Sequence, residues 1–395
     1  MTPKNTMYEY LNLRGEQTFG TNPFNEVDNL ILAQLAYVDF DGIVGESRDD
    51  KISIGDVCSK YWEMHTAEEI RNRSSFVKNS PFLLKPVAES RRFGKTMLAG
   101  YVNYISKDAE AQMSAVQFYL EDGTTYVAFR GTDETIIGWK EDFNLSYMIR
   151  TEGQRLAVEY LEKNFKDTRL RLRVGGHSKG GNFAIFASAF ACDAVKTQIL
   201  EVFTNDGPGF RKEITELKEY KDVLKKTKSF IPSYSIIGRL LSSGLNPKVV
   251  GSSAKGILQH NAMTWQITDD HFQYTERAGD SIFVENVLDD WIKNVDDNAR
   301  RLFVDQIFNI LQAAGGDTME EIKDSTLRDL GEAISMIRKI PKDQQKELSE
   351  VLEKLVRSGE KNIYELIGLK ENLPEVIRKW AAKRESRIES DETDE

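Results

Sequence analysis

One serine stands between closely spaced glycines in the middle of the sequence. The pentad 176–180, Gly-His-Ser-Lys-Gly, follows an apolar-alternating run at 170–174 and precedes a helical run of small residues at 182–191. This context predicts a strand, a tight turn and a helix, which together lift a serine nucleophile clear of a sheet. The glycines favour such a turn because it brings strand and helix too close together for Cβ atoms. The amide of Lys179, at the helix N-terminus, would then point at an oxyanion formed over Ser178.

Serine hydrolysis also requires a base near Ser178 and an acid that holds the base, and in α/β-hydrolases these follow in the chain order serine, acid, histidine. Two histidines come after Ser178. We expect His260 to be the base, because it stands in a turn after a short strand expected at 249–250. The alternative is a histidine that only bonds to backbone. His271 lies in the polar segment 268–271, where an imidazole could simply be solvated.

Asp206 is the expected acid. It ends the apolar run 199–205 and is followed by Gly-Pro-Gly. This places a carboxylate at the carboxyl edge of the strand after the nucleophile strand, where ligands sit in open α/β sheets. The next expected strand, 228–231, leads to Ser235 and offers no carboxylate. An aspartate that caps a turn is the alternative for Asp206.

Another expected strand ends in Arg-Gly-Thr. The run 126–130 leads directly into Gly131 and Thr132. Gly131 lets the backbone approach a substrate closely, so we expect the amide of Thr132 to join that of Lys179 in an oxyanion hole.

Strand-like and helix-like patterns alternate around these residues. Two β-rich runs at 113–120 and 124–130 are separated by a hairpin-type turn,. Next come, in order, a helix at 154–164, a strand at 170–175, a helix at 182–191 and a strand at 199–204. Strands that alternate with helices favour a mostly parallel, doubly wound sheet. We therefore expect an α/β fold of the α/β-hydrolase type, with flanking helices.

Three regions are expected along the chain. Residues 1–110 look mainly helical and predict an extension packed on the core. Residues 111–285 would form the hydrolase core, with a cap segment at about 207–259. Within the cap, 235–241 would form a helix whose apolar face contacts substrate, with ordinary core packing as the alternative. Residues 286–395 carry a long apolar stripe at helical spacing and an acidic tail, which predicts a helical region that packs on the core or binds a protein partner.

Composition narrows the class of protein. The chain of 395 residues is 40% hydrophobic and has a formal net charge of −10, which predicts a globular protein and argues against nucleic acid as a partner. Cys58 and Cys192 form no metal-ligand or disulfide pattern. We therefore expect no metal, no cofactor and a reducing, cytoplasmic setting. No apolar stretch of about 18 residues occurs, so stable membrane insertion is not expected.

Taken together, the motifs resemble a known superfamily. They are Asn-Pro-Phe-Asn-Glu-Val-Asp at 22–28, Phe-Arg-Gly-Thr-Asp at 129–133, Trp139 and Asp142, Gly-Gly-His-Ser-Lys-Gly-Gly-Asn at 175–182, Asn-Asp-Gly-Pro-Gly at 205–209 and Gln259-His260. They look like the class 3 (fungal-type) lipases and, more closely, like a lipase-like bacterial α/β-hydrolase family of unknown function, over about residues 8–270. The resemblance implies Ser178 as nucleophile, His260 as base, Asp206 as acid and Thr132 as an oxyanion contributor.

Two positions depart from the class 3 lipases. Those lipases usually have an apolar residue after the nucleophile, whereas Lys179 would place a cation beside the site. They also carry the acid after a later strand, where this chain offers Ser235, so the acid is expected at Asp206, as in pancreatic-type lipases. In addition, arginines alternate through 169–173. This is unusual for a strand buried on both faces, and it predicts a sheet face that is partly open or covered by polar groups of the C-terminal helices.

We therefore expect a serine hydrolase that cleaves a small-molecule or lipid-like carboxylic ester. A thioesterase or an amidase could use the same residues, because the same constellation serves all acyl transfers. The alternative from another class of function is a catalytically silent hydrolase scaffold that binds a partner through residues 286–395.

Overall fold

A computed structural model describes residues 5–73, 77–106, 108–132, 140–142, 144–241 and 243–279, together with residues 297, 298 and 301. The expected C-terminal helices, apart from those three residues, and the acidic tail lie outside the described residues. The proposed partner-binding surface of this region lies outside them too. Among the residues that the structure describes, no helix is long and apolar enough to cross a membrane.

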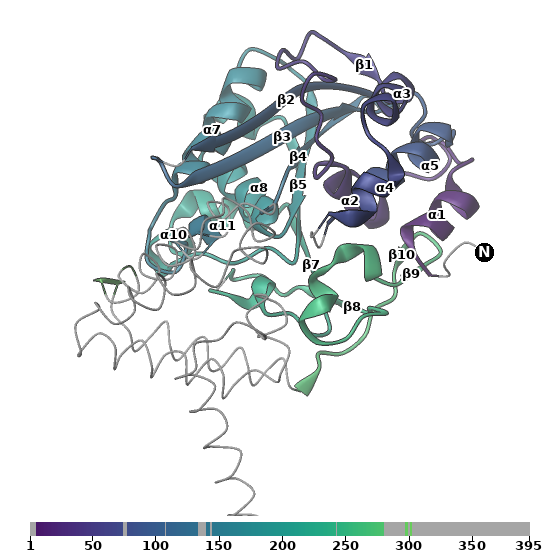
Figure 1. Ribbon diagram of the computed structural model, residues 1–395. Coiled ribbons are helices and arrows are strands. Elements are labelled where there is room, and N and C mark those ends of the chain that lie inside the picture. Colours follow the sequence, from purple (N-terminus) through teal and green to yellow (C-terminus); the bar gives the residue numbers. More distant parts are fainter. Residues whose placement is uncertain are drawn as a thin grey trace, which may run out of the picture. The chain divides into compact units, whose positions relative to one another are not determined.

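In the described part of the chain, eight strands form one sheet in the order of the sequence (Figure 1). Strands β1 to β4 pair antiparallel and β4 to β8 pair parallel. The antiparallel β3–β4 pair needs only a short turn, in which Gly123 has φ +76°, whereas each parallel pair needs a longer crossover. The strands are β1 (Ile52–Ser53), β2 (Met97–Ser106), β3 (Ala111–Tyr119), β4 (Thr124–Phe129), β5 (Arg171–His177), β6 (Ile199–Asn205), β7 (Thr227–Pro232) and β8 (Lys248–Val250), with a separate ribbon of β9 (Ile267–Thr268) and β10 (His271–Phe272).

Helices cover both faces of this sheet (Figure 1). Successive residues of β4 point to opposite faces: Tyr126 and Ala128 join a core cluster with helices α1, α2, α3 and α5, and Val127 and Phe129 join a cluster with α7, α8 and α11,. A mostly parallel sheet with helices on both faces confirms the expected α/β-hydrolase fold. The α-helices are α1 (Met7–Arg14), α2 (Glu26–Leu35), α3 (Ile54–Met64), α4 (Ala67–Asn72), α5 (Leu84–Glu89), α7 (Glu152–Phe165), α8 (Lys179–Phe190), α9 (Asp193–Lys196), α10 (Lys212–Thr215) and α11 (Lys218–Leu224). Short 3-10 helices are η1 (Ser80–Leu83), η2 (Ile237–Arg239), η3 (Gly256–His260) and η4 (Ala262–Thr264).

The first 110 residues hold strands as well as helices. Both β1 and β2 lie in the region that we expected to be mainly helical, and β2 pairs with β3 along its length. The pairing shifts between Ala99 and Val102, where Gly100 has φ +62°. Because this irregularity interrupts the two-residue period, hydrophobic patterning does not identify β2. The sheet therefore begins inside the expected N-terminal extension.

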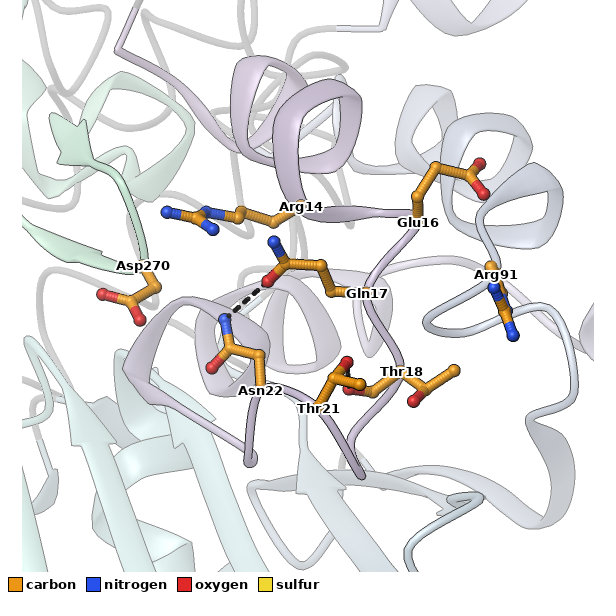
Figure 2. A pocket seen from close by; sticks show the side chains of 8 residues that line it. All are labelled: Arg14, Glu16, Gln17, Thr18, Thr21, Asn22, Arg91 and Asp270. Atoms are coloured by element: carbon orange, nitrogen blue, oxygen red, sulfur yellow. Dashed lines mark hydrogen bonds between the residues drawn. The ribbon is translucent and has the colours of Figure 1, made fainter.

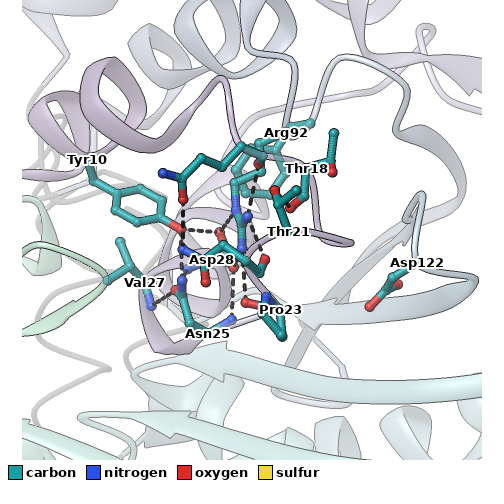
Figure 3. A network of polar contacts seen from close by, with 12 residues as sticks. Tyr10, Thr18, Thr21, Pro23, Asn25, Val27, Asp28, Arg92 and Asp122 are labelled. Carbon is teal, nitrogen blue, oxygen red and sulfur yellow. Dashed lines mark hydrogen bonds and ion pairs between the residues drawn. The ribbon is translucent and has the colours of Figure 1, made fainter.

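A buried ion pair fastens the N-terminal segment. The side chains of Asp28 and Arg92 have no exposed surface, and Nε and Nη2 of Arg92 lie 2.7 Å and 2.5 Å from the two carboxylate oxygens of Asp28. The guanidinium also donates to three backbone carbonyls, those of Gln17, Asn22 and Pro23 (Figure 3). This one cation therefore ties the loop between α1 and α2, and α2 itself, to the segment that precedes β2.

Arg173 of β5 is covered by groups from the sheet and the N-terminal segment. Its guanidinium lies 2.9 Å from the carboxylate of Asp122, 3.0 Å from that of Glu201 and 4.3 Å from the centroid of the Phe24 ring. The other two arginines of the alternating series are exposed. We expected a face that is partly open or covered by polar groups of the C-terminal helices, and these helices lie outside the described residues. At Arg173 itself, two carboxylates neutralise the charge and an aromatic ring packs on it, which lets a charged residue occupy an inner strand.

The expected cap segment, 207–259, contributes two strands to the sheet, β7 and β8, and also contains the helices α10 and α11. Within it, 235–241 contains the short 3-10 helix η2 in place of a regular helix, and Leu241 has φ +65°. The apolar side chains of this segment are half-buried. Their contact with a substrate stays a prediction.

Candidate active site

Ser178 occupies the sharp turn between β5 and α8. It has φ 56° and ψ −135°, a conformation that a residue with a side chain rarely adopts,. A Cβ at Gly176 would overlap the backbone of Gly180, and a Cβ at Gly180 would overlap the carbonyl of Phe129. The Ser178 amide donates to the carbonyl of Asn205 in β6 at 2.9 Å. The glycines thus have the steric role expected from the sequence, and the neighbouring strand holds the turn.

The structure brings Ser178, His260 and Asp206 into one chain of hydrogen bonds. Nε2 of His260 lies 3.0 Å from Oγ of Ser178, and Nδ1 lies 2.6 Å from Oδ2 of Asp206. With the Asp206 carboxylate as acceptor, Nδ1 of His260 carries the proton, and Nε2 can accept the proton of the Ser178 hydroxyl. Asp206 is 1% exposed and Ser178 8% exposed, whereas the His260 side chain keeps 22% of its surface. The ring of His260 is therefore the most exposed of the three groups.

Two groups that follow β7 hold the carboxylate of Asp206. Its Oδ1 accepts from the Ser235 hydroxyl at 2.5 Å and from the Gly238 amide at 3.1 Å. This leaves Oδ2 for His260. Ser235 is the residue at the position where the resemblance to the class 3 lipases would place an acid, and it bonds to Asp206. From the sequence, Ser235 marks only the absence of a carboxylate, and its support of Asp206 is not predicted.

Thr132 follows directly on a residue that packs against the serine. A Cβ at Gly131 would lie 3.0 Å from Cβ of Ser178 and 2.6 Å from the carbonyl oxygen of His177, so glycine lets this strand end approach the turn closely. The hydroxyl of Thr132 donates to Oδ2 of Asp142. This bond orients Thr132 at the carboxyl edge of β4, beside Ser178.

Lys179 places its backbone amide next to Ser178, whereas its charged side chain is buried. We expected its cation beside the substrate. Instead its side chain is fully buried, with Nζ 3.2 Å from Oε2 of an equally buried Glu141. Glu141 also accepts from the amides of Gln112 and Gly153. A carboxylate that no sequence motif singles out therefore neutralises the lysine. The amide of Lys179 still begins helix α8 next to Ser178.

Asp142, which holds Thr132, titrates in an unusual range. Burial raises its pKa from 3.8 to about 6, while the charge of Lys179 and the bond from Thr132 act in the opposite direction. Its Oδ1 has no contact with solvent and no hydrogen-bond partner among the described residues. Because the pKa in the folded state is raised, the folded protein is favoured most while Asp142 is protonated in both states, below about pH 4, and loses this contribution as pH rises to about 6.

Asp142→Asn tests this pH dependence. The asparagine can still accept from Thr132 but does not ionise. We expect the free energy of unfolding of the variant to gain on that of the wild type between about pH 4 and pH 6, by about 3 kcal/mol, and to gain nothing further at higher pH. Urea unfolding at a series of pH values measures the difference. Parallel stability curves for the two proteins would contradict the raised pKa.

A polar pocket of about 620 Å³ lies apart from these residues (Figure 2). It is lined by polar side chains of the N-terminal segment, among them Arg14, Gln17 and Asn22, and by Asp270 of the β9–β10 turn. Gln17 and Asn22 bond to one another across it. None of the candidate catalytic residues lines this pocket.

His271, the other histidine after Ser178, and Asp269 flank Asp270 of this pocket in the sequence. Asp269 pairs with Arg14. His271 is exposed, and its Nδ1 bonds to the carbonyl of Phe272. Neither takes part in the hydrogen-bond chain at Ser178.

The family model described as Mbeg1-like matches residues 87–309, more than half of the chain. The chain belongs to this family. The matched segment contains Ser178, Asp206 and His260, and the Mbeg1-like family is lipase-like, which suggests a hydrolase. No curated protein matches the sequence. Among solved structures the Mbeg1-like chain is similar to one described as "Crystal structure of M37 lipase", at 15% identity and a TM-score of 0.32, over 45% of this chain and 70% of that chain.

Proposed function

We propose that this protein is a serine hydrolase that cleaves a carboxylic ester. The observation that carries the proposal is the chain of hydrogen bonds from Asp206 through His260 to Ser178, with the serine on a strained turn at the carboxyl edge of a mostly parallel sheet. A serine hydroxyl becomes a useful nucleophile only with an adjacent base that is itself oriented by a third group. Membership of a lipase-like family supports the same reaction class.

The proposed reaction has two steps. Oγ of Ser178 attacks the acyl carbonyl while Nε2 of His260 takes the hydroxyl proton, and the amides of Thr132 and Lys179 stabilise the oxyanion. Collapse of this intermediate breaks the ester bond, and the alcohol leaves with the proton from His260. Water then attacks the acyl-serine, with His260 as base, and releases a carboxylic acid and the free serine. Asp206 orients the imidazole and stabilises its charged form.

The pairing of Lys179 with Glu141 supports an uncharged acyl group as the substrate. Since both side chains are fully buried and bonded to one another, the residue after the nucleophile adds no free cation to the acyl-binding surface. A small-molecule or lipid-like ester is therefore favoured over an anionic one. The same chemistry cleaves thioesters and amides.

Labelling of the intact protein by a fluorophosphonate tests the proposal, because this reagent reports an activated serine without a guess at the substrate. Turnover of an oxygen ester, a thioester and an amide of one acyl group then separates the bond types. We expect labelling and preferential cleavage of the oxygen ester. A folded protein that is not labelled and cleaves none of the three would contradict the proposal and favour the silent scaffold.

Asp206→Asn separates the acid from the base. The asparagine can hold the ring but cannot stabilise the imidazolium, so we expect a loss in kcat on the order of 10⁴-fold, against on the order of 10⁶-fold for His260→Ala. Steady-state kinetics on the cleaved ester measure both. Asp269→Asn is the matched control, since Asp269 is an exposed aspartate paired with Arg14, and it should keep full activity. Full activity of Asp206→Asn together with a loss in the control would overturn the assignment of the acid.

A further inference from the structure

The histidine that precedes the nucleophile is buried and bonded through both ring nitrogens. His177 is 1% exposed. Its Nδ1 lies 2.9 Å from the hydroxyl of Tyr37, and its Nε2 lies 2.8 Å from the carbonyl oxygen of His260. The two imidazole rings also contact one another, with centroids 4.7 Å apart and planes inclined by 35°. His177 thus touches the backbone and the ring of the proposed base.

These partners leave one arrangement of protons. The carbonyl of His260 can only accept, so Nε2 of His177 must donate. In a neutral imidazole Nδ1 is then the acceptor, and the hydroxyl of Tyr37 donates to it. The carbonyl of His260 therefore selects the tautomer of His177, and Tyr37 satisfies the acceptor nitrogen of that tautomer.

The environment keeps His177 neutral. Burial, and then the repulsion from a charged His260, hold the pKa of His177 well below its usual range. When His260 takes the proton of Ser178, the ring packed on it carries no competing positive charge. A buried lysine or arginine in this place would oppose the imidazolium that the reaction requires.

The segment that carries His260 is fixed at two successive carbonyls. The indole Nε1 of Trp265 donates to the carbonyl of Gln259 at 2.9 Å, and His177 donates to the next one. The side chain of Gln259 accepts from the hydroxyl of Ser233 and the amide of Tyr234. Among these bonds, the one from His177 is made by the residue next to Ser178. It therefore links the segment that carries the nucleophile to the segment that carries His260.

We infer that His177 is a positioning residue: as the neutral tautomer whose Nδ1 accepts from Tyr37, it sets the distance between Nε2 of His260 and Oγ of Ser178. This inference rests on the proposed function. The hydroxyl of Tyr37 also lies against Gly131. The same hydroxyl therefore contacts both His177 and the residue that precedes Thr132. A shift of the base by about 1 Å is enough to cost on the order of 10²-fold in rate.

His177→Phe and His177→Gln are the variants that test the inference. Phenylalanine keeps a ring against His260 but cannot donate, whereas the amide of glutamine can donate to the same carbonyl. We expect His177→Phe to lower kcat and the rate of fluorophosphonate labelling by about 10- to 100-fold while KM changes by less than about 2-fold. His177→Gln should recover most of the loss. The downfield proton signal of His260 Nδ1 should weaken or shift in the first variant and return in the second.

Two further variants keep the outcome interpretable. His65→Phe is the matched control, since His65 lies at the end of α3 and pairs with Glu69, and it should label at the wild-type rate. Tyr37→Phe removes the donor to Nδ1 and leaves this buried nitrogen without that partner, which loosens the ring that donates to His260. It should lower the labelling rate in the same direction, even where His177→Phe fails to fold.

The results separate the inference from the function on which it rests. If the wild type is not labelled at all, the proposed function fails and the inference falls with it. If the wild type is labelled and a folded His177→Phe reacts at the same rate, only the positioning role is overturned. Equal losses in the phenylalanine and glutamine variants, or an unchanged Tyr37→Phe, would also overturn it, because a role in packing alone does not depend on the hydrogen-bond donor.

Discussion

Ser178→Ala is expected to abolish covalent labelling by a fluorophosphonate and to lower kcat on the cleaved ester by on the order of 10⁶-fold. The hydroxyl is the proposed nucleophile, and no other group can replace it on the strained turn between β5 and α8. The loss of one oxygen should leave the circular dichroism spectrum and the melting temperature close to those of the wild type. Gel fluorescence after labelling and ester turnover measure the two effects.

Ser188→Ala provides the matched control for this loss. Ser188 lies on the same helix, α8, it is 2% exposed, and its hydroxyl has no hydrogen-bond partner among the described residues. The control should label fully. Undiminished labelling of Ser178→Ala would show that another residue reacts and would overturn the assignment of the nucleophile.

Arg92→Met is expected to destabilise the fold by about 3 to 5 kcal/mol. The substitution leaves the carboxylate of Asp28 buried without its partner and removes the donor to three backbone carbonyls. The cost of an unpaired buried charge then exceeds any gain from the apolar side chain. Chemical unfolding in urea, followed by circular dichroism, measures the change in unfolding free energy.

The neighbouring Arg91 is the control for Arg92. It is exposed, so Arg91→Met should change the stability by less than about 0.5 kcal/mol. The double variant Asp28→Leu/Arg92→Met should be less destabilised than Arg92→Met alone, because it leaves no unpaired charge. Equal stability of Arg91→Met and Arg92→Met would contradict the role of the ion pair.

Local sequence patterns determined the main strands and the order of the site residues. The glycines at 176 and 180 predict the turn that presents Ser178, since the need for room without a Cβ is a property of the turn itself,. The hairpin between β3 and β4 and the alternation that follows predict the mostly parallel sheet. Asp206 and His260 could be selected because few acids and histidines stand at ends of strands or in turns after Ser178. The relation to the class 3 lipases stays a prediction.

The tertiary structure decided which distant groups meet. In the sequence, Lys179 looks like a cation beside the site. In the structure, Glu141 neutralises it from a position 38 residues earlier in the chain. Ser235 supports Asp206 across 29 residues, and His177 reaches the carbonyl of His260 across 83. Hydrophobic periodicity reports whether a position is buried, but it carries no information about which polar partner shares the interior with it.

The same limit applies to strand β2 and to Arg173. The irregular pairing at Gly100 hides β2 from a pattern of alternate residues, although its neighbour β3 is found readily. The alternating arginines predict a face that is partly open or covered by polar groups, but they do not predict that Asp122, Glu201 and Phe24 contact Arg173. Steric demands of single turns and the two-residue period of regular strands are local, so the sequence alone determined them. The pairing of buried charges depends on contacts between remote segments, and only the folded chain decides it.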